Sequence, residues 1–226
     1  MGKYHVYKPV GQRMGELIEH VKSTYTCNKA CYSGRLDEMA EGIVLILTDE
    51  DCKDCRKHDQ HNKIYEFTML AGISTDTGDI LGIHQAYNDD LNILTEKEIT
   101  NNMLDYNGKH ILQKRPVHSS IKYKILKNNQ QPEKRVYIEN CEYLGSDNVT
   151  TVNIIEKLNL LNDINNTFRK QEIINCWEKY LGEVFKTFTF RVKVSSGTYV
   201  RQLIMDVSEK SGFPLTALNI KRIGYC

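Results

Sequence analysis

The aspartate at position 37 is the first residue whose surroundings suggest chemistry. Asp37 lies between Gly34 and Gly42, in a segment that the two glycines mark as a loop. Residues 43–47 follow directly and are all aliphatic, which predicts a strand buried on both faces. A carboxylate at the mouth of such a strand can act as a nucleophile, bind a metal, or bond to its own backbone in a turn. Composition alone favours the turn, so the other residues must decide.

An arginine near the C-terminus is the second candidate. Residues 188–194 alternate between apolar and polar types, which predicts a half-buried strand. A turn over residues 195–199 leads to a predicted helix over residues 200–211, and Arg201 falls in the first turn of that helix. A cation at this end opposes the helix dipole. We therefore expect Arg201 to have an anionic partner.

Two cysteines and two histidines follow one another at a constant spacing of three: Cys52, Cys55, His58 and His61. Their residue types suit zinc, but a tetrahedral site usually splits its ligands into two pairs separated by a longer loop. On the predicted helix over residues 49–61, a spacing of three drifts around the surface. The pattern favours a solvated helix face, with zinc as the alternative.

Basic residues suited to a polyanion occur in two places. The segment 111–124 mixes Lys and Arg with aromatic and hydroxyl residues, which suits phosphate contacts or, equally well, a solvated sheet edge. In the turn over residues 8–11, Pro9 and Gly11 set the backbone so that Lys8 is presented at a loop tip.

Composition restricts the class of protein. The chain has 226 residues, of which 40% are hydrophobic and 26% charged, as in ordinary globular domains. Its net charge of +1 means that a polyanion must be met by a local basic patch. Seven scattered cysteines indicate reduced thiols, and neither a membrane span nor a signal peptide is apparent. These features predict a cytoplasmic protein in a reducing environment.

The elements that must position Asp37 and Arg201 form one predicted domain, residues 1–226. Alternating strands and amphipathic helices continue along the chain, and we find no internal repeat and no low-complexity linker. The segment 146–182 has apolar spacing that favours one or two helices packed on the core, which we interpret as a helical insertion.

Five stretches, in order across nearly the whole chain, resemble the TruB family of RNA pseudouridine synthases. They are Lys8-Pro9-x-Gly11; Gly34-Arg35-Leu36-Asp37-x-x-Ala40-x-Gly42; Lys63-x-Tyr65 with Thr75-Asp76-Thr77-Gly78-Asp79-x-x-Gly82; Gln113-x-x-Pro116-x-x-Ser119-x-x-Lys122; and Gly197-Thr198-Tyr199-Val200-Arg201 with Lys221-Arg222. The resemblance has departures: Tyr32 and Glu38 replace a histidine and a proline of bacterial members. The segment 146–182 is longer than the usual hairpin, and the chain ends where close relatives continue into a PUA domain.

The resemblance implies an α+β pseudouridine synthase fold, with a mixed, largely antiparallel central sheet flanked by helices and an active-site cleft across the sheet. It implies an isomerase that converts uridine to pseudouridine in structured RNA, with uridine 55 of the tRNA T-loop as the expected target. Such a reaction needs no cofactor and no metal, and it requires the base to be flipped from its stack. A monomer that binds RNA and no membrane is expected. The alternative is an RNA-binding or RNA-folding protein of the same fold with little or no catalysis.

The resemblance also implies roles for single residues. Asp37 is the expected nucleophile, Arg201 its counter-cation, and Tyr65 the residue that stacks on the uracil near the C5 proton. Four further residues are expected to bind the substrate: Tyr32, Tyr199, Ile220 and Lys8. Contacts with the RNA backbone are expected from Arg35, Lys114, Arg115, Lys122, Lys221 and Arg222.

Overall fold

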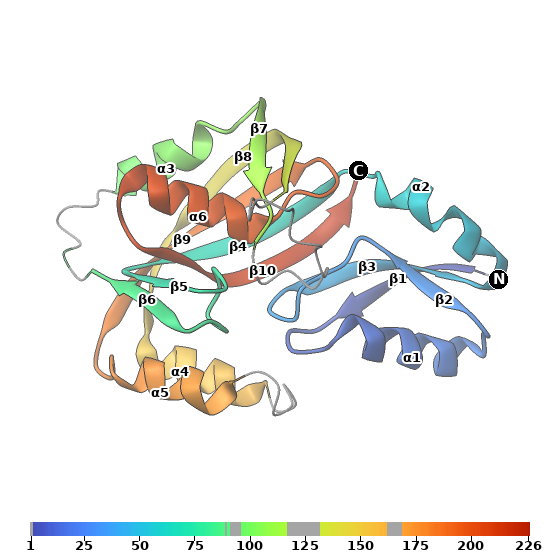
Figure 1. The fold of residues 1–226 in the computed structure, drawn as a ribbon, viewed down its shortest axis with the longest axis horizontal. Helices are drawn as coiled ribbons and strands as arrows, with labels where there is room; N and C mark the ends of the chain where they lie inside the picture. The colour runs from blue at the N-terminus through green and yellow to red at the C-terminus, as the bar shows by residue number, and fades with distance from the viewer. Residues whose placement is uncertain (1, 89, 91–95, 117–131, 162–168) are drawn as a thin grey trace.

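A central sheet carries the architecture. The computed structural model describes residues 2–88, 90, 96–116, 132–161 and 169–226, and Figure 1 shows their arrangement. Within these residues the main sheet has eight strands: β1 Gly2–Lys8, β2 Ala30–Ser33, β3 Glu41–Thr48, β4 Lys63–Ala71, β7 Lys109–Lys114, β8 Glu133–Thr150, β9 Val184–Val194 and β10 Leu215–Tyr225. Strands β5, Ile73–Thr75, and β6, His84–Tyr87, form a separate pair.

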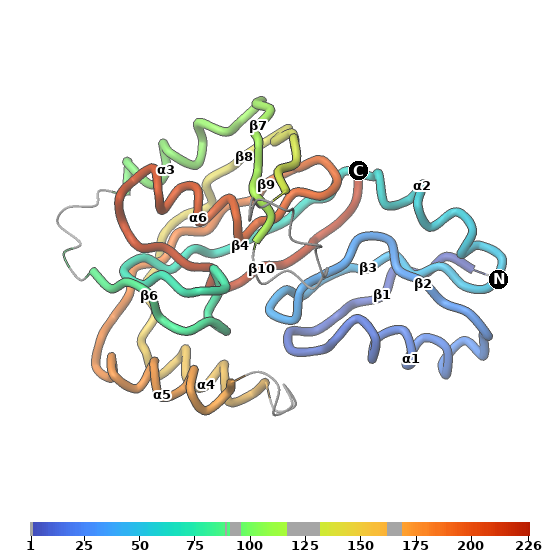
Figure 2. The backbone as a smooth tube through the Cα atoms, in the orientation of Figure 1, coloured from blue at the N-terminus to red at the C-terminus, as the bar shows by residue number. Residues whose placement is uncertain are grey.

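The sheet order joins the two ends of the chain. The strands follow the order β1-β3-β10-β4-β9-β8-β7, with β2 also paired to β3. Every pair is antiparallel except β3 and β10, which run parallel through Glu41 and Gly42 opposite Lys221 and Arg222. Figure 2 shows β10 passing between β3 and β4 through the middle of the molecule. The predicted α+β fold with a largely antiparallel sheet is confirmed.

Helices cover the sheet with their apolar faces. They are α1 Met14–Tyr25, α2 Cys55–Asp59, α3 Glu96–Leu104, α4 Thr151–Leu160, α5 Lys170–Glu178 and α6 Val200–Ser211. Buried side chains of α1, α3 and α6 share one core with the strands, and Figure 1 shows α3 and α6 side by side. The helices α4 and α5 pack around Trp177 in a second core. None of the helices in the described ranges is long and apolar enough to cross a membrane.

Two predicted segments differ in the structure. The predicted helix 49–61 is divided into a 3-10 helix, Asp49–Asp54, and the short α2. The hydroxyl of Thr48, at the N-cap of the 3-10 helix, donates to the carbonyl of Gly2 in the neighbouring strand and does not cap the helix. The segment 146–182 begins as strand rather than helix, because β8 stays paired with β9 up to Thr150 before α4 begins.

Candidate active site

A cavity of about 390 Å³ opens between β10, β4, the start of α6 and the loop that follows β2. We call residues 34–40 the Asp37 loop. The cavity brings together Asp37, Tyr65 and Arg201, which lie far apart in the sequence. It is also lined by six other residues to which the resemblance gives a role: Tyr32, Arg35, Arg115, Tyr199, Ile220 and Arg222.

An ion pair stands at the base of the cavity. An Nη of Arg201 lies 2.6 Å from Oδ2 of Asp37, and it donates a hydrogen bond to that oxygen. The Arg201 side chain is only 4% exposed, whereas the Asp37 side chain is 29% exposed. The carboxylate therefore faces the open cavity while its cation is enclosed by protein.

A second carboxylate holds the other side of the same guanidinium. The other Nη of Arg201 lies 3.2 Å from Asp79 and donates to the carbonyl of Thr77 at 2.7 Å. Burial lowers the pKa of Arg201, but the charges of Asp37 and Asp79 outweigh it and raise that pKa above its ordinary value. Burial raises the pKa of Asp79, and the charge of Arg201 opposes that rise. Each buried ion depends on the other to remain charged.

Tyr199 is held in place by a side chain from the far edge of the sheet. The amide of Gln113, on β7, donates to the carbonyl of Tyr199 at 3.0 Å and accepts from its backbone N–H at 2.8 Å. Gln113 is 1% exposed, so the bidentate contact is shielded from water. It fixes the residue that precedes α6 and, with it, the start of the helix that carries Arg201.

Lys8 corrects an expectation. It does not reach a loop tip or the cavity lining; it is completely buried and donates to the carbonyls of Ala40 at 2.7 Å, Pro9 at 3.0 Å and Glu38 at 3.4 Å. Burial lowers the pKa of Lys8 to about 8, although Glu38 and Asp37 oppose this shift. Lys8 supports the Asp37 loop from beneath and is shielded from any substrate.

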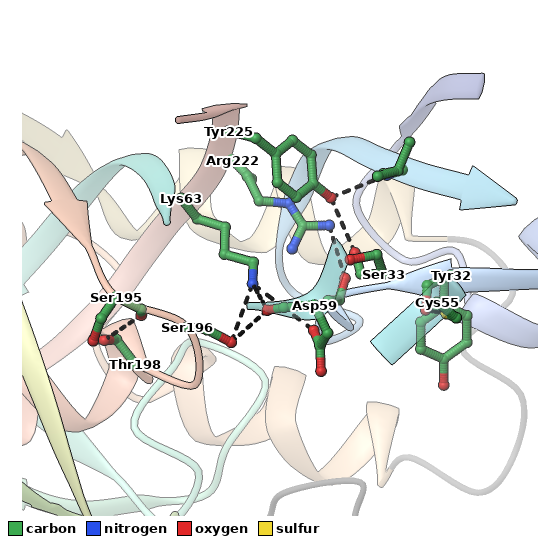
Figure 3. A network of polar contacts seen from close by, with 12 residues as sticks. Tyr32, Ser33, Cys55, Asp59, Lys63, Ser195, Ser196, Thr198, Arg222 and Tyr225 are labelled. Atoms are coloured by element: carbon green, nitrogen blue, oxygen red, sulfur yellow. Dashed lines mark hydrogen bonds and ion pairs between the residues drawn. The ribbon is translucent and has the colours of Figure 1, made fainter. Parts of the chain in front are cut away.

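Arg222 corrects a second expectation. Although it borders the cavity, it is 1% exposed, and its guanidinium donates to the carbonyls of Gly34 at 2.9 Å and Ile43 at 2.7 Å. A side chain so enclosed cannot pair with an RNA phosphate in this conformation. Figure 3 shows it beside the ring of Tyr225.

The other predicted backbone contacts divide into three groups. Arg35 is exposed at the cavity and Arg115 lines it half-buried. Lys114 and Lys221 are exposed but lie outside the cavity lining. Lys122 lies outside the described residues.

Some cavity residues had no predicted role. Lys63 is buried and donates to the carbonyl of Asp59 at 2.6 Å and to the hydroxyl of Ser196 at 3.3 Å (Figure 3). Lys134 donates to the carbonyl of Ser196 at 2.8 Å. Burial lowers the pKa of Lys63 to about 8. Lys63 could have been found within its motif, whereas Lys134 and Asp59 join the site only through the tertiary fold.

The two departures from the family pattern have different outcomes. Tyr32 lines the cavity. Glu38 turns away from Asp37, toward α1, where it lies 3.3 Å from Arg13. The second carboxylate therefore stays out of the cavity lining.

The cysteine and histidine series does not converge. The thiol of Cys52 donates to the carbonyl of Leu47, that of Cys55 donates to the carbonyl of Tyr32, and the rings of His58 and His61 stack on each other. Across the residues that the structure describes, no group of three or more His, Cys, Asp or Glu side chains is arranged to hold a metal ion.

Comparison with known proteins gives a matching family model and several relatives. The family model described as "TruB family pseudouridylate synthase (N terminal domain)" matches residues 22–157. The tRNA pseudouridine synthase B of Caldicellulosiruptor saccharolyticus is 29% identical over 218 residues, which cover 96% of this chain and 64% of that protein. The tRNA pseudouridine synthase B of Aquifex aeolicus is 28% identical, with coverage of 93% and 63%. The chain thus spans less than two thirds of these relatives.

Solved structures share the fold. A chain of a Cbf5-Nop10-Gar1 complex matches with a TM-score of 0.64 and 18% identity, covering 99% of this chain and 48% of that one. A chain of an H/ACA RNP bound to a substrate RNA that contains 2′-deoxyuridine matches with a TM-score of 0.60 and 16% identity. Since the family model covers more than half of the sequence, the chain belongs to the TruB family of pseudouridylate synthases.

Proposed function

We propose that this chain isomerises uridine to pseudouridine in structured RNA, with uridine 55 of the tRNA T-loop as its substrate. The observation that carries the proposal is the Asp37–Arg201 ion pair, which opens on one side into the cavity. An ionised carboxylate is a nucleophile only if its charge survives desolvation, and the guanidinium at 2.6 Å supplies the compensation. The relatives named tRNA pseudouridine synthase B support the choice of tRNA.

The reaction would use the cavity residues as follows. The target uridine leaves its stack and enters the cavity, where Tyr65 and Tyr32 can stack on the base. Asp37 attacks the nucleoside, at the sugar or at the base, and the bond between N1 and the ribose breaks. The base turns, C5 bonds to the ribose, C5 loses its proton and N1 gains one. Atoms balance within the substrate, so the reaction is an isomerisation.

The proposal also covers the domain, the oligomeric state and the compartment. We propose that residues 1–226 form one catalytic domain, that it works as a monomer, and that it works in a reducing cytoplasm. The seven cysteines, all free, support the last point. Within that domain we interpret the two helices α4 and α5 as a helical insertion.

The test uses a T-stem-loop RNA labelled with tritium at C5 of uridine 55. We expect the wild-type protein to release tritium to water and the Asp37→Asn variant to release none, while both bind the RNA with similar affinity. A cytidine at position 55 provides the substrate control. If neither the wild type nor the variant releases tritium although both bind the RNA, the result would support the RNA-folding alternative instead.

A further inference from the structure

Two side chains of β10, Arg222 and Tyr225, form hydrogen bonds with the backbone on both sides of the Asp37 loop. The guanidinium of Arg222 donates to the carbonyl of Gly34, the first residue of the loop, and to the carbonyl of Ile43, just beyond its end. One rigid planar group thereby ties the two ends of the loop to each other and to the C-terminal strand.

Tyr225 repeats the arrangement one step further out. Its hydroxyl donates to the carbonyl of Ser33 at 3.1 Å and accepts from the backbone N–H of Leu45 at 3.0 Å. Ser33 and Leu45 are the last cross-strand pair of β2 and β3 before the loop begins. The hydroxyl therefore bridges β2 and β3 at the point where the loop leaves them, as Figure 3 shows around Ser33.

The two side chains also support each other. The guanidinium of Arg222 lies 5.1 Å from the centre of the Tyr225 ring, within the range of a cation–π contact. Both stand on the same strand, and β10 is held on its other side by antiparallel pairing with β4. The loop is therefore held by a strand at the centre of the sheet and not by a flexible segment.

From this geometry we propose that Arg222 and Tyr225 are positioning residues, which set the backbone of the Asp37 loop so that the carboxylate meets the target nucleoside in line. The inference rests on the proposed function and deepens it. The ion pair with Arg201 fixes the tip of the Asp37 side chain, and Lys8 holds two carbonyls within the loop. Attack also needs the two ends of the loop to be fixed. A misplacement of about 1 Å at a reacting atom can cost about a hundredfold in rate.

The first experiment removes a single oxygen. Tyr225→Phe keeps the ring on Arg222 but leaves Ser33 and Leu45 without the hydroxyl. We expect kcat on the T-stem-loop to fall about tenfold with KM within about twofold, since binding of the ground state is not affected. Tyr143→Phe is the matched control, because its hydroxyl bonds Glu96 at 2.7 Å outside the cavity lining. It should leave kcat unchanged.

A second readout does not depend on catalysis. In RNA-free protein, hydrogen exchange of the backbone amides in residues 34–43 should be faster in Tyr225→Phe than in the wild type, and unchanged in Tyr143→Phe. Arg222→Lys keeps the positive charge but cannot reach both carbonyls, so it should show a larger loss of kcat and faster exchange.

The possible results distinguish a failure of this inference from a failure of the proposed function. Normal kcat and normal exchange in Tyr225→Phe would overturn the inference. A loss of RNA affinity with normal exchange in Arg222→Lys would do the same, since it would return Arg222 to the RNA backbone. A wild-type protein that binds the RNA but is inactive on it would contradict the proposed function, while the exchange experiment would still decide whether the loop is held from β10.

Discussion

One guanidinium serves two carboxylates in this site, and the carboxylates differ in their access to solvent. The side chain of Asp37 is 29% exposed and faces the cavity, whereas that of Asp79 is 5% exposed and accepts from the Thr77 hydroxyl and the Leu81 amide. In the proposed reaction Asp37 forms a bond to the nucleoside, and its charge would then be consumed in an ester. Arg201 would then be a buried cation with Asp79 as its remaining counter-ion.

This division of roles predicts the effect of Asp79→Asn. The amide keeps the volume but removes the charge that stabilises Arg201 once Asp37 has reacted, so kcat should fall about 10–100-fold. The Kd for RNA should stay within about twofold. Single-turnover kinetics together with filter binding would measure both. Asp76→Asn, in the same turn but paired with Arg169 at 2.8 Å, is the control that should keep its kcat. An equal loss in both variants would contradict the prediction.

The sequence motifs predicted the Asp37–Arg201 pair better than the supporting cations. Asp37 and Arg201 were identified because each stands within a dense motif, and the structure brings them together. The resemblance predicts that Lys8 contacts the substrate and Arg222 the RNA, and this requires both side chains to be exposed, as charged residues usually are. Both are buried because carbonyls distant in sequence satisfy their donors, and a linear sequence does not show which carbonyls those are.

At the scale of elements, the parallel contact between β3 and β10 joins the two halves of the site. It depends on Gly42, whose backbone has a φ of +120° and lies against the backbone of Arg222. A Cβ added to Gly42 would come within 2.1 Å of the Arg222 carbonyl oxygen. This contact cannot be relieved by rotating a side chain, because the atom it meets belongs to the main chain.

Gly42→Ala should therefore destabilise the fold by more than about 3 kcal/mol, through a disfavoured backbone angle and separation of the two strands. Gly15→Ala is the matched control. It lies in α1, where an added Cβ meets nothing within 4 Å, and it should stabilise by up to about 1 kcal/mol. Urea unfolding of the two variants measures both changes. A free energy of unfolding for Gly42→Ala within about 1 kcal/mol of the wild type would show that β10 can shift to make room.

A second element-scale prediction concerns β6 and α5. The ring of His84 packs edge-on to Trp177 at 4.4 Å, and burial, with a smaller contribution from Lys179, lowers its pKa to about 4. Between pH 6.5 and 4 the unfolded chain therefore binds a proton at His84 that the folded chain excludes. Because the unfolded state then binds more protons, stability falls as the pH is lowered through this window.

His84→Phe keeps a ring against Trp177 and removes the titrating group. From pH 7 to pH 4.5 the wild type should lose about 1–2 kcal/mol more stability than the variant, a value reduced because water still reaches part of the ring. Urea unfolding at the two pH values would measure the difference. Parallel losses in both proteins would mean that other groups set the acid sensitivity.

The strands were predictable because a period of two is visible in residues such as 188–194, whereas the breaks between elements were not. Residues 49–61 contain no glycine or proline to interrupt a helix, yet Asp49 has a φ of +49° and accepts from the backbone amides of Asn28 and Lys29. That tertiary contact fixes the start of the segment, which begins as a 3-10 helix and not as an α-helix. It joins residues about twenty positions apart, which local pattern does not report.

At the scale of the whole molecule, the net charge is small, but basic residues gather around the cavity. The net charge is +1. The cavity nevertheless has six basic residues in its lining against two acidic ones, Asp37 and Asp59. The basic residues are Arg35, Lys63, Arg115, Lys134, Arg201 and Arg222. A polyanion is therefore attracted to one face, and most of these cations are already engaged with carbonyls or carboxylates.

Arg35 is the exposed member of this group, so it should be the one that exchanges counter-ions with an RNA phosphate. In Arg35→Ala the slope of log Kd against log salt should become shallower by about 0.7–0.9, the contribution of one phosphate contact. Arg56→Ala removes another exposed arginine, from α2 and outside the cavity lining, and should leave the slope unchanged. Fluorescence anisotropy with a T-stem-loop RNA across a salt series would measure both. Equal slopes in the two variants would mean that RNA is held by a surface other than the rim of this cavity.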